Sequence, residues 1–119
     1  MADYFITRRA AFDLPDIYVR SVENWGEGVA DEYIKAIYGV FKQIAESPDL
    51  GRAREGRSRP FLMYPVKQHL VIYEAFPKGI MVAALLDQVG DIESIIKGLG
   101  PSFGAEITAL KKQLLDRKD

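Results

Sequence analysis

The chain has 119 residues, of which 48% are hydrophobic and 28% are charged, and its formal net charge is −1. These values are typical of one globular domain with a single core. The near-zero net charge excludes a protein that binds nucleic acid through its overall charge. The chain contains no cysteine, which excludes disulfides and thiol chemistry.

The N-terminal residues contain no apolar segment of the kind that signal peptides have, and no segment approaches the length of a membrane span. We therefore expect a soluble cytoplasmic protein that has no membrane partner.

The first predicted element is a short strand from Asp3 to Thr7, which must pair with a later strand because a single strand is not stable alone. Thr7 is a suitable N-cap for a helix that begins at Arg8. Pro15 indicates that this helix either kinks there or begins there. Apolar or small residues follow at spacings of three and four, so we expect this face to be buried: Ala11, Leu14, Tyr18, Ser21, Val22 and Trp25.

Asp13 and Asp16 lie between these positions on the same predicted helix. Two neighbouring carboxylates can act as general acid and base in an active site. Here the helical spacing favours a solvent-exposed face for both of them.

A second helix is predicted from Val29 to Glu46, after the break at Gly26-Glu27-Gly28 and before the turn at Ser47–Gly51. Its apolar stripe is wide enough to cover a sheet and to contact the first helix, so the two helices form a hairpin. The stripe consists of Val29, Tyr33, Ile37, Val40, Phe41 and Ile44, widened by Ala30, Ile34 and Tyr38.

Three strands are predicted at residues 61–66, 69–76 and 80–86, joined by two tight turns. The last strand is almost wholly apolar, as expected of a central strand that is covered on both faces. The predicted fold class is α+β. The N-terminal strand and the helical hairpin pack on a small antiparallel sheet as a two-layer sandwich, with an extra C-terminal helix.

The end of the chain contains two further helical patterns. Asp91 can cap a short helix over residues 92–97, and Ser102 can cap a last helix. This last helix carries one apolar stripe, made of Phe103, Ile107, Leu110 and Leu114. Because an isolated helix of this length is marginal in water, we expect it to dock on its own domain near the last strand, with a symmetric dimer as the alternative.

An arginine-rich loop lies between the turn at Gly51 and Pro60. It is either a solvated loop or an anchor for an acidic peptide, because arginine forks bind carboxylates in two-point geometry. Nucleic-acid contact is the weaker option, since no aromatic residue is interleaved for base stacking. The four residues of this candidate binding site are Arg52, Arg54, Arg57 and Arg59.

His69 is the only histidine of the chain, so neither a histidine–cysteine metal site nor a histidine cluster can form. The sequence also contains no Gly-x-Ser-x-Gly nucleophile motif and no P-loop. We therefore expect a structural role for His69, no cofactor, no metal and no catalytic residue.

Several short motifs occur together in a specific order, and this ordered set resembles the ParE branch of the RelE/ParE toxin superfamily over residues 3–86. The motifs are Asp13-Leu14 with Ile17, Trp25-Gly26, Ser47-Pro48-Asp49-Leu50-Gly51-Arg52, and Tyr64-Pro65-Val66 with His69, Val71 and Tyr73. After Leu86 the family typically continues into a basic His-Gly-Arg-like segment, whereas this chain has Asp87-Gln88-Val89-Gly90.

The resemblance implies the toxin of a bacterial type II toxin–antitoxin pair. ParE-like toxins act on DNA gyrase, and a ribbon-helix-helix antitoxin neutralises them by wrapping its C-terminal tail around them. It implies a toxin domain over residues 1–96 and a C-terminal helical extension of the same domain over residues 97–119. The arginine loop is then the expected antitoxin-binding site.

Two alternatives stay open. The related RelE branch consists of ribosome-dependent ribonucleases, which need a base and several cations on the central strands. Residues 69–86 offer only His69 and Lys78 for this purpose, which favours a toxin that acts by binding. The acidic residue after Leu86 also leaves open a non-toxic member that only binds a partner.

Overall fold

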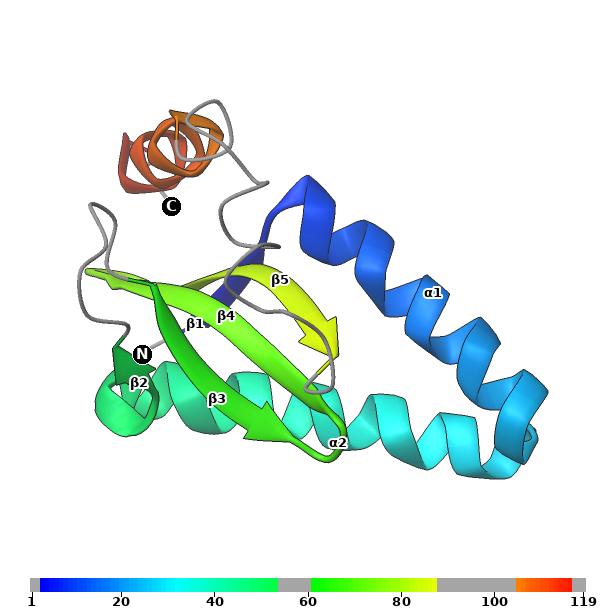
Figure 1. The fold of residues 1–119 in the computed structure, drawn as a ribbon. Helices are drawn as coiled ribbons and strands as arrows, with labels where there is room; N and C mark the ends of the chain where they lie inside the picture. Colours follow the sequence, from blue (N-terminus) through cyan, green and yellow to red (C-terminus); the bar gives the residue numbers. More distant parts are fainter. Residues whose placement is uncertain (1–2, 54–60, 88–104, 117–119) are drawn as a thin grey trace.

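The computed structural model describes residues 3–53, 61–87 and 105–116, and it contains one five-stranded sheet within these ranges (Figure 1). The strand order is β1-β5-β4-β3-β2. The strands are β1 (Asp3–Ile6), β2 (Arg52–Ala53), β3 (Leu62–Val66), β4 (His69–Phe76) and β5 (Gly79–Asp87). The predicted α+β fold and the predicted meander of three consecutive strands are confirmed.

The first strand pairs with β5 in parallel, so the sheet is mixed, whereas its other three strand pairs are antiparallel. This parallel pairing is possible because the whole helical hairpin lies between β1 and the meander and carries the chain back to the starting edge. As a result β5 is flanked by β1 and β4, and every residue from Gly79 to Leu86 is buried.

A β-bulge between β4 and β5 decides which side chains of β5 face each layer. Ile72 pairs with Ala84 and Tyr73 pairs with Val82, so Ala83 has no opposite residue. The extra residue resets the alternation of the strand. Val82 and Leu85 therefore both face the helical hairpin, which a regular strand would not allow.

The helical hairpin consists of α1 (Arg8–Trp25) and α2 (Glu27–Glu46), and it covers one face of the sheet. The N-cap is Thr7, as predicted, because its hydroxyl accepts the Ala10 N–H at 3.1 Å. The helix begins at Arg8 and continues through Pro15. The largest fully buried side chains of α2 are Ile37, Phe41 and Ile44.

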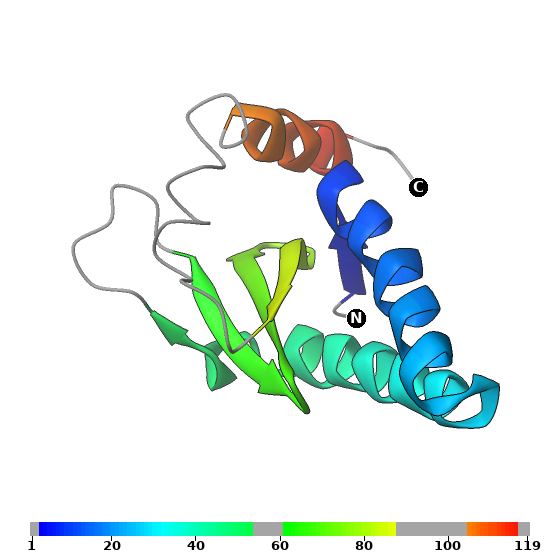
Figure 2. The same cartoon turned by 45° about the vertical axis from the view of Figure 1, so that its right-hand side comes forward.

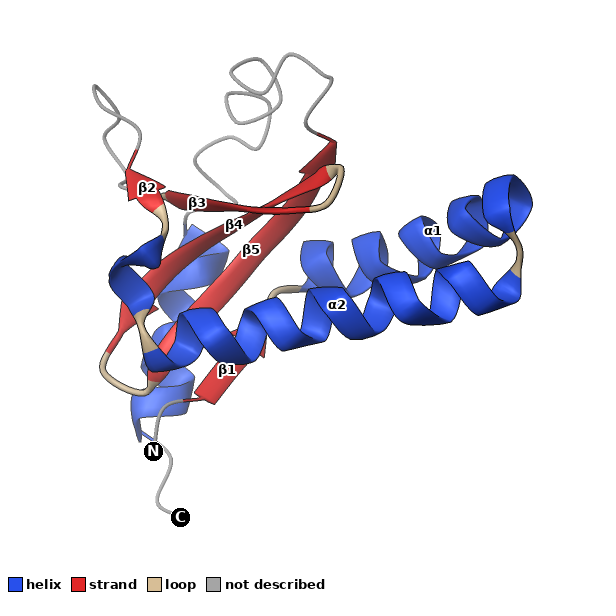
Figure 3. Ribbon diagram, turned by 90° about the horizontal axis from the view of Figure 1, so that it is seen from below, coloured by secondary structure: helices blue, strands red, loops and turns tan. Residues whose placement is uncertain are grey.

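The predicted buried face of α1 is only partly right. Leu14 and Ser21 are buried, but Ala11 is exposed and Trp25 is 50% exposed. Trp25 ends α1 at the tip of the hairpin, and Figure 3 shows that this tip extends beyond the edge of the sheet. Val29, on the predicted stripe of α2, lies at the same tip and is also exposed. The buried face of α1 consists of Ala10, Asp13, Leu14, Ile17 and Ser21.

Residues 105–116 form a helix on the other face of the sheet, opposite to α2 (Figure 2). Ile107 is fully buried, and Leu110 and Leu114 pack against the same cluster of strand residues. The helix is also tied to β4 by an ion pair between Lys111 and the buried Glu74. The prediction that this helix docks on its own domain is therefore confirmed for the described residues.

The remaining predictions for the C-terminal part cannot be compared with the structure. The predicted helix over residues 92–97, the caps Asp91 and Ser102, Phe103 and the domain boundary at residue 96 lie outside the described residues. None of the helices that the structure describes is long and apolar enough to cross a membrane.

Candidate functional site

Side chains at the start of α1 complete the hydrogen bonding of β5 where β1 ends. The last β1–β5 backbone bond runs from the Thr7 N–H to Val82 O at 3.0 Å. The Thr7 hydroxyl then donates to the carbonyl of the bulged Ala83 at 2.7 Å. Further along α1, Asp13 Oδ2 accepts the Leu85 N–H at 3.1 Å. Thr7 and Asp13 thus form the hydrogen bonds to β5 that further residues of β1 would otherwise form, since buried backbone groups must be paired.

This arrangement corrects the prediction that Asp13 lies on a solvated face. Asp13 is buried, and its carboxylate also accepts the Arg9 Nε–H at 3.0 Å. Asp16 is exposed as predicted and pairs with Arg20 at 3.1 Å. The two carboxylates differ because only Asp13 faces the unpaired edge of β5.

His69, at the start of β4, lies in a buried polar cluster. Its Nδ1 is 2.5 Å from the Tyr33 hydroxyl of α2, and its Nε2 is 3.1 Å from Asp87 Oδ1 at the end of β5. The Tyr33 hydroxyl also accepts the Gln68 N–H at 3.1 Å. Since this hydroxyl accepts from Gln68, it donates to Nδ1, which places the ring N–H on Nε2, the nitrogen on the side of Asp87.

The electrostatics of this cluster favour a neutral imidazole. Burial lowers the pKa of His69, with Asp87 opposing and Arg20 reinforcing the shift and Asp13 opposing it more weakly. Burial also raises the pKa of Tyr33, so its hydroxyl keeps the proton that it donates. A neutral, buried histidine with both nitrogens facing named side chains holds α2 against the hairpin of β3 and β4.

The end of β5 is acidic where the family resemblance implies a basic segment. Asp87 lies 3.5 Å from the guanidinium of Arg20 and 3.1 Å from His69. Both of these contacts draw Asp87 toward α1 and β4. The arrangement therefore neutralises this acid locally within the described part of the chain.

The turn motif after α2 is held by Tyr73 of β4. The Tyr73 hydroxyl donates to Pro48 O at 2.7 Å, in the 3-10 helix η1 (Pro48–Leu50), and accepts the Gly51 N–H at 2.8 Å. A Cβ on Gly51 would lie 2.4 Å from this hydroxyl, so only glycine fits. These two hydrogen bonds, which we call the Tyr73–Gly51 latch, fix the position at which the arginine-rich loop begins.

The structure describes one of the four candidate arginines. Arg52 is exposed on the short edge strand β2. Arg54, Arg57 and Arg59 lie outside the described residues. Whether the four side chains form one binding site therefore stays a prediction.

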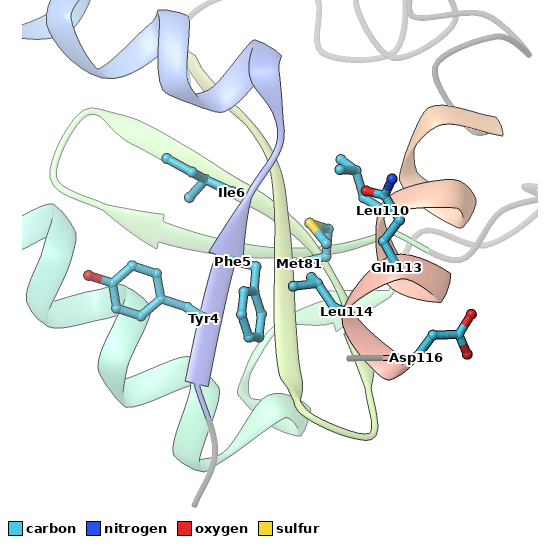
Figure 4. Close-up of a pocket in the computed structure, with 8 residues that line it drawn as sticks. All are labelled: Tyr4, Phe5, Ile6, Met81, Leu110, Gln113, Leu114 and Asp116. Atoms are coloured by element: carbon cyan, nitrogen blue, oxygen red, sulfur yellow. The ribbon is translucent and has the colours of Figure 1, made fainter. Parts of the chain in front are cut away.

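A groove of about 800 Å³ lies on the opposite side of the molecule, between β1 and the helix of residues 105–116. Figure 4 shows Phe5, Met81 and Leu114 converging in it, while Tyr4 and Ile6 project to the other side of β1. Gln113 and Asp116 form its polar rim. The sequence analysis missed this groove, because the groove depends on how the C-terminal helix crosses the strand.

Within the described ranges, no three histidine, aspartate or glutamate side chains gather in a way that could hold a metal ion. The polar clusters that the structure does contain are bound to the backbone or to each other. Within the described residues, Arg52 and the groove beside β1 are candidates for partner binding.

Comparisons with known proteins point to one family. Residues 4–92 match the family described as the ParE toxin of the type II toxin-antitoxin system, parDE. Toxin ParE1 of Caulobacter vibrioides is 32% identical over 73 residues, which make up 61% of this chain and 76% of that protein. A solved structure of the chromosomal ParDE TA system from P. aeruginosa has a TM-score of 0.62 at 20% identity, and covers 73% of this chain and 96% of that one. The structural match supports the same fold.

Proposed function

Because this chain belongs to the ParE toxin family of type II toxin–antitoxin systems, we propose that it acts by binding DNA gyrase, and that a cognate antitoxin of the ribbon-helix-helix class neutralises it. The proposal places toxin, target and antitoxin together in the cytoplasm. Growth arrest then results from an occupied target and needs no chemical step on the toxin itself.

The observation that carries the proposal is the environment of His69. A ribonuclease of the RelE kind needs a base that can reach the 2′-hydroxyl of its substrate. The single histidine of this chain is buried, and its two nitrogens face Tyr33 and Asp87. Within residues 69–86 the remaining cation is Lys78, in the turn before β5, which favours binding over catalysis.

The antitoxin is proposed to bind the arginine-rich loop through an acidic part of its tail. Arg52 supports this proposal because it is exposed and because the Tyr73–Gly51 latch holds the start of the loop in place. Arg57 and Arg59 belong to the same loop. Arginine–carboxylate pairs of this kind contribute about 1.5–3 kcal/mol each when they are well formed.

One observation favours a second candidate function, that of a non-toxic family member that only binds its partner. Asp87 ends β5 and is paired with Arg20 and His69, at the place where the family resemblance implies basic residues. If the target is recognised by positive charge at this edge, an acidic residue there removes toxicity. The antitoxin-binding part of the proposal would be unaffected.

The test is inducible expression of the full chain, with DNA breakage, gyrase supercoiling and translation assayed side by side. We expect growth arrest with inhibited supercoiling and intact translation, and rescue by the co-expressed antitoxin. Rapid loss of translation with cleaved mRNA would overturn the gyrase proposal. Growth without arrest, together with retained antitoxin binding, would establish the non-toxic alternative instead.

Two variants separate the parts of the proposal. A folded His69→Ala chain should keep any toxicity, and an inert one would restore the ribonuclease hypothesis. Reversal of Arg57 and Arg59 to glutamate should weaken antitoxin binding by more than about 1–2 kcal/mol, measured by titration calorimetry. Reversal of Lys35 and Lys42, which are exposed on α2, is the matched control and should leave the affinity unchanged.

A further inference from the structure

The outer edge of β1 carries backbone groups that the sheet does not use. β1 is the end strand, and its bonds to β5 include those from the Asp3 N–H to Lys78 O and from the Thr7 N–H to Val82 O. Because successive residues of a parallel strand alternate in direction, the N–H and C=O groups of Tyr4 and Ile6 point away from β5. No other described strand lies beyond them.

Nothing in β1 protects this edge in the way that edge strands are usually protected. Charged side chains, proline or a bulge normally block such an edge, but after Asp3 the strand consists of Tyr4, Phe5 and Ile6. Tyr4 contacts the half-exposed Tyr38 of α2, with ring centroids 6.3 Å apart. Phe5 lines the groove on the opposite face. Within the described residues, the edge is therefore apolar on both sides and open along its backbone.

The charges at the two ends of the strand are complementary to each other. Asp3 is the first residue of β1, and Arg8 lies two residues after its end. Both side chains are exposed, and neither has an ion pair among the described residues. An antiparallel copy of the same strand would place Asp3 of one chain near Arg8 of the other. We propose that β1 pairs with β1 of a second copy of this chain, so that the two sheets join into one across a twofold axis.

One register satisfies all the outward groups. If Tyr4 of each copy lies opposite Ile6 of the other, both residues exchange N–H and C=O bonds, which gives four hydrogen bonds about the axis. Phe5 then lies opposite Phe5 of the second copy, in a pair without hydrogen bonds. Both rings point to the face of the helix of residues 105–116, where each groove supplies Leu114 and Met81 as apolar neighbours. The interface does not depend on the target of the toxin.

A single cysteine tests this register directly, because the chain has none of its own. Opposite residues of a pair without hydrogen bonds have Cα atoms about 4.5 Å apart, which is within the range of a disulfide. Under mild oxidation Phe5→Cys should form a covalent dimer in high yield. Val19→Cys, at an exposed position of α1, is the control and should stay monomeric on the same gel. A folded Phe5→Cys chain that does not cross-link would contradict the register.

The second test measures the mass of the full chain in solution. Tyr4→Pro removes an N–H that β5 does not use, so the fold should keep its melting temperature while the dimer dissociates. Asp3→Arg and Arg8→Glu should each weaken the dimer, and the two together should restore it. If Tyr4→Pro does not fold, these charge variants still test whether the dimer forms through β1.

Three results would overturn the proposal. The first is a parent chain that stays monomeric at its highest soluble concentration. The second is a dimer that persists in both Tyr4→Pro and Asp3→Arg, since its interface then lies elsewhere. The third is a Tyr4→Pro variant that loses antitoxin binding while its mass in solution stays that of the parent, because the edge then belongs to the antitoxin.

Discussion

The two faces of the sheet are covered in physically different ways. The face under α1 and α2 combines a large apolar cluster with polar contacts of fixed geometry, from Thr7 to Ala83, from Asp13 to Leu85 and from Tyr33 to His69. The other face is covered by the helix of residues 105–116, through an apolar stripe and the Lys111–Glu74 ion pair. We call these the hairpin face and the C-terminal face.

The difference parallels the extent of the family. The family match ends at residue 92, so it includes the whole hairpin face but not the helix of residues 105–116. Directional hydrogen bonds specify one arrangement of the hairpin on the strands, whereas apolar burial is largely non-directional. We infer that the hairpin face specifies the family fold and that the C-terminal helix is an addition that side-chain volume and one ion pair keep in place.

The largest expected effects come from the apolar core of each face. Phe41→Ala on the hairpin face should lower the free energy of unfolding by about 3–5 kcal/mol, and Ile107→Ala on the C-terminal face by about 2–5 kcal/mol, because both side chains are fully buried. Urea denaturation measures both. If Ile107→Ala leaves global unfolding unchanged while amides of residues 105–116 exchange faster, the C-terminal helix opens by itself and the two faces are not one cooperative unit.

The next effect tests the polar contacts of the hairpin face. Asp13→Ala should lower the free energy of unfolding by about 1–3 kcal/mol, because it leaves the buried Leu85 N–H unpaired. Asp16→Ala is the matched control on the same helix, and its exposed pair with Arg20 should be worth less than about 1 kcal/mol. Equal losses for the two variants would mean that the Asp13 contact does not distinguish the hairpin face.

A smaller loss is expected for the latch that begins the arginine-rich loop. Tyr73→Phe keeps the ring but removes the hydroxyl that joins Pro48 O and the Gly51 N–H, so we expect a loss of about 1–2 kcal/mol in thermal or chemical denaturation. Tyr38→Phe, with its ring at the surface of α2, should be neutral. If Tyr73→Phe also weakens antitoxin binding, the latch positions the loop as well as stabilising the fold.

The pH dependence of stability should reveal the buried imidazole of the hairpin face. Burial lowers the pKa of His69, so below about pH 6.5 the unfolded chain binds more protons than the folded one. The contribution of the neutral imidazole is therefore complete above that pH and is lost as the pH falls, by at most about 1.4 kcal/mol per pH unit. Melting temperatures from pH 7.5 to 5.5, pH values that bracket the ordinary histidine pKa, measure this loss.

The control for this effect is His69→Asn, whose side-chain oxygen can still accept the Tyr33 hydroxyl. Its stability should change less over the same pH range. An equal decline in both proteins would assign the pH dependence to other groups.

The smallest effect is expected on the C-terminal face. Replacing the Glu74–Lys111 pair by leucine and methionine should change the free energy of unfolding by no more than about 1 kcal/mol, because a buried ion pair is often matched by apolar residues of similar volume. Lys111→Met alone should be clearly less stable than the double variant. A large loss in the double variant would show that this face is also specified by polar contacts.

Much of the local structure followed from patterns along the chain. The ends of α2, β3, β4 and the two turns lie within two residues of their predicted positions, because proline, glycine and hydrophobic period act over short distances. The Thr7 cap, the docking of the C-terminal helix and the arrangement of three consecutive antiparallel strands were predicted for the same reason. The role of His69 as a buried structural residue also agrees with its environment in the structure.

The sequence by itself therefore determined the two helices of the hairpin, four of the five described strands, the α+β class and the family, but not the short edge strand β2. Only the tertiary structure decided that β1 is parallel to β5, that Ala83 bulges, that Asp13 is buried and that a groove lies beside Phe5. Apart from the bulge, these features join residues more than seventy positions apart, as between Asp13 and Leu85, and no short-range period contains that information. The spacing of residues along a helix shows which side chains share a face. Which of these side chains contacts a distant strand depends on the backbone N–H and C=O groups that this strand leaves unpaired.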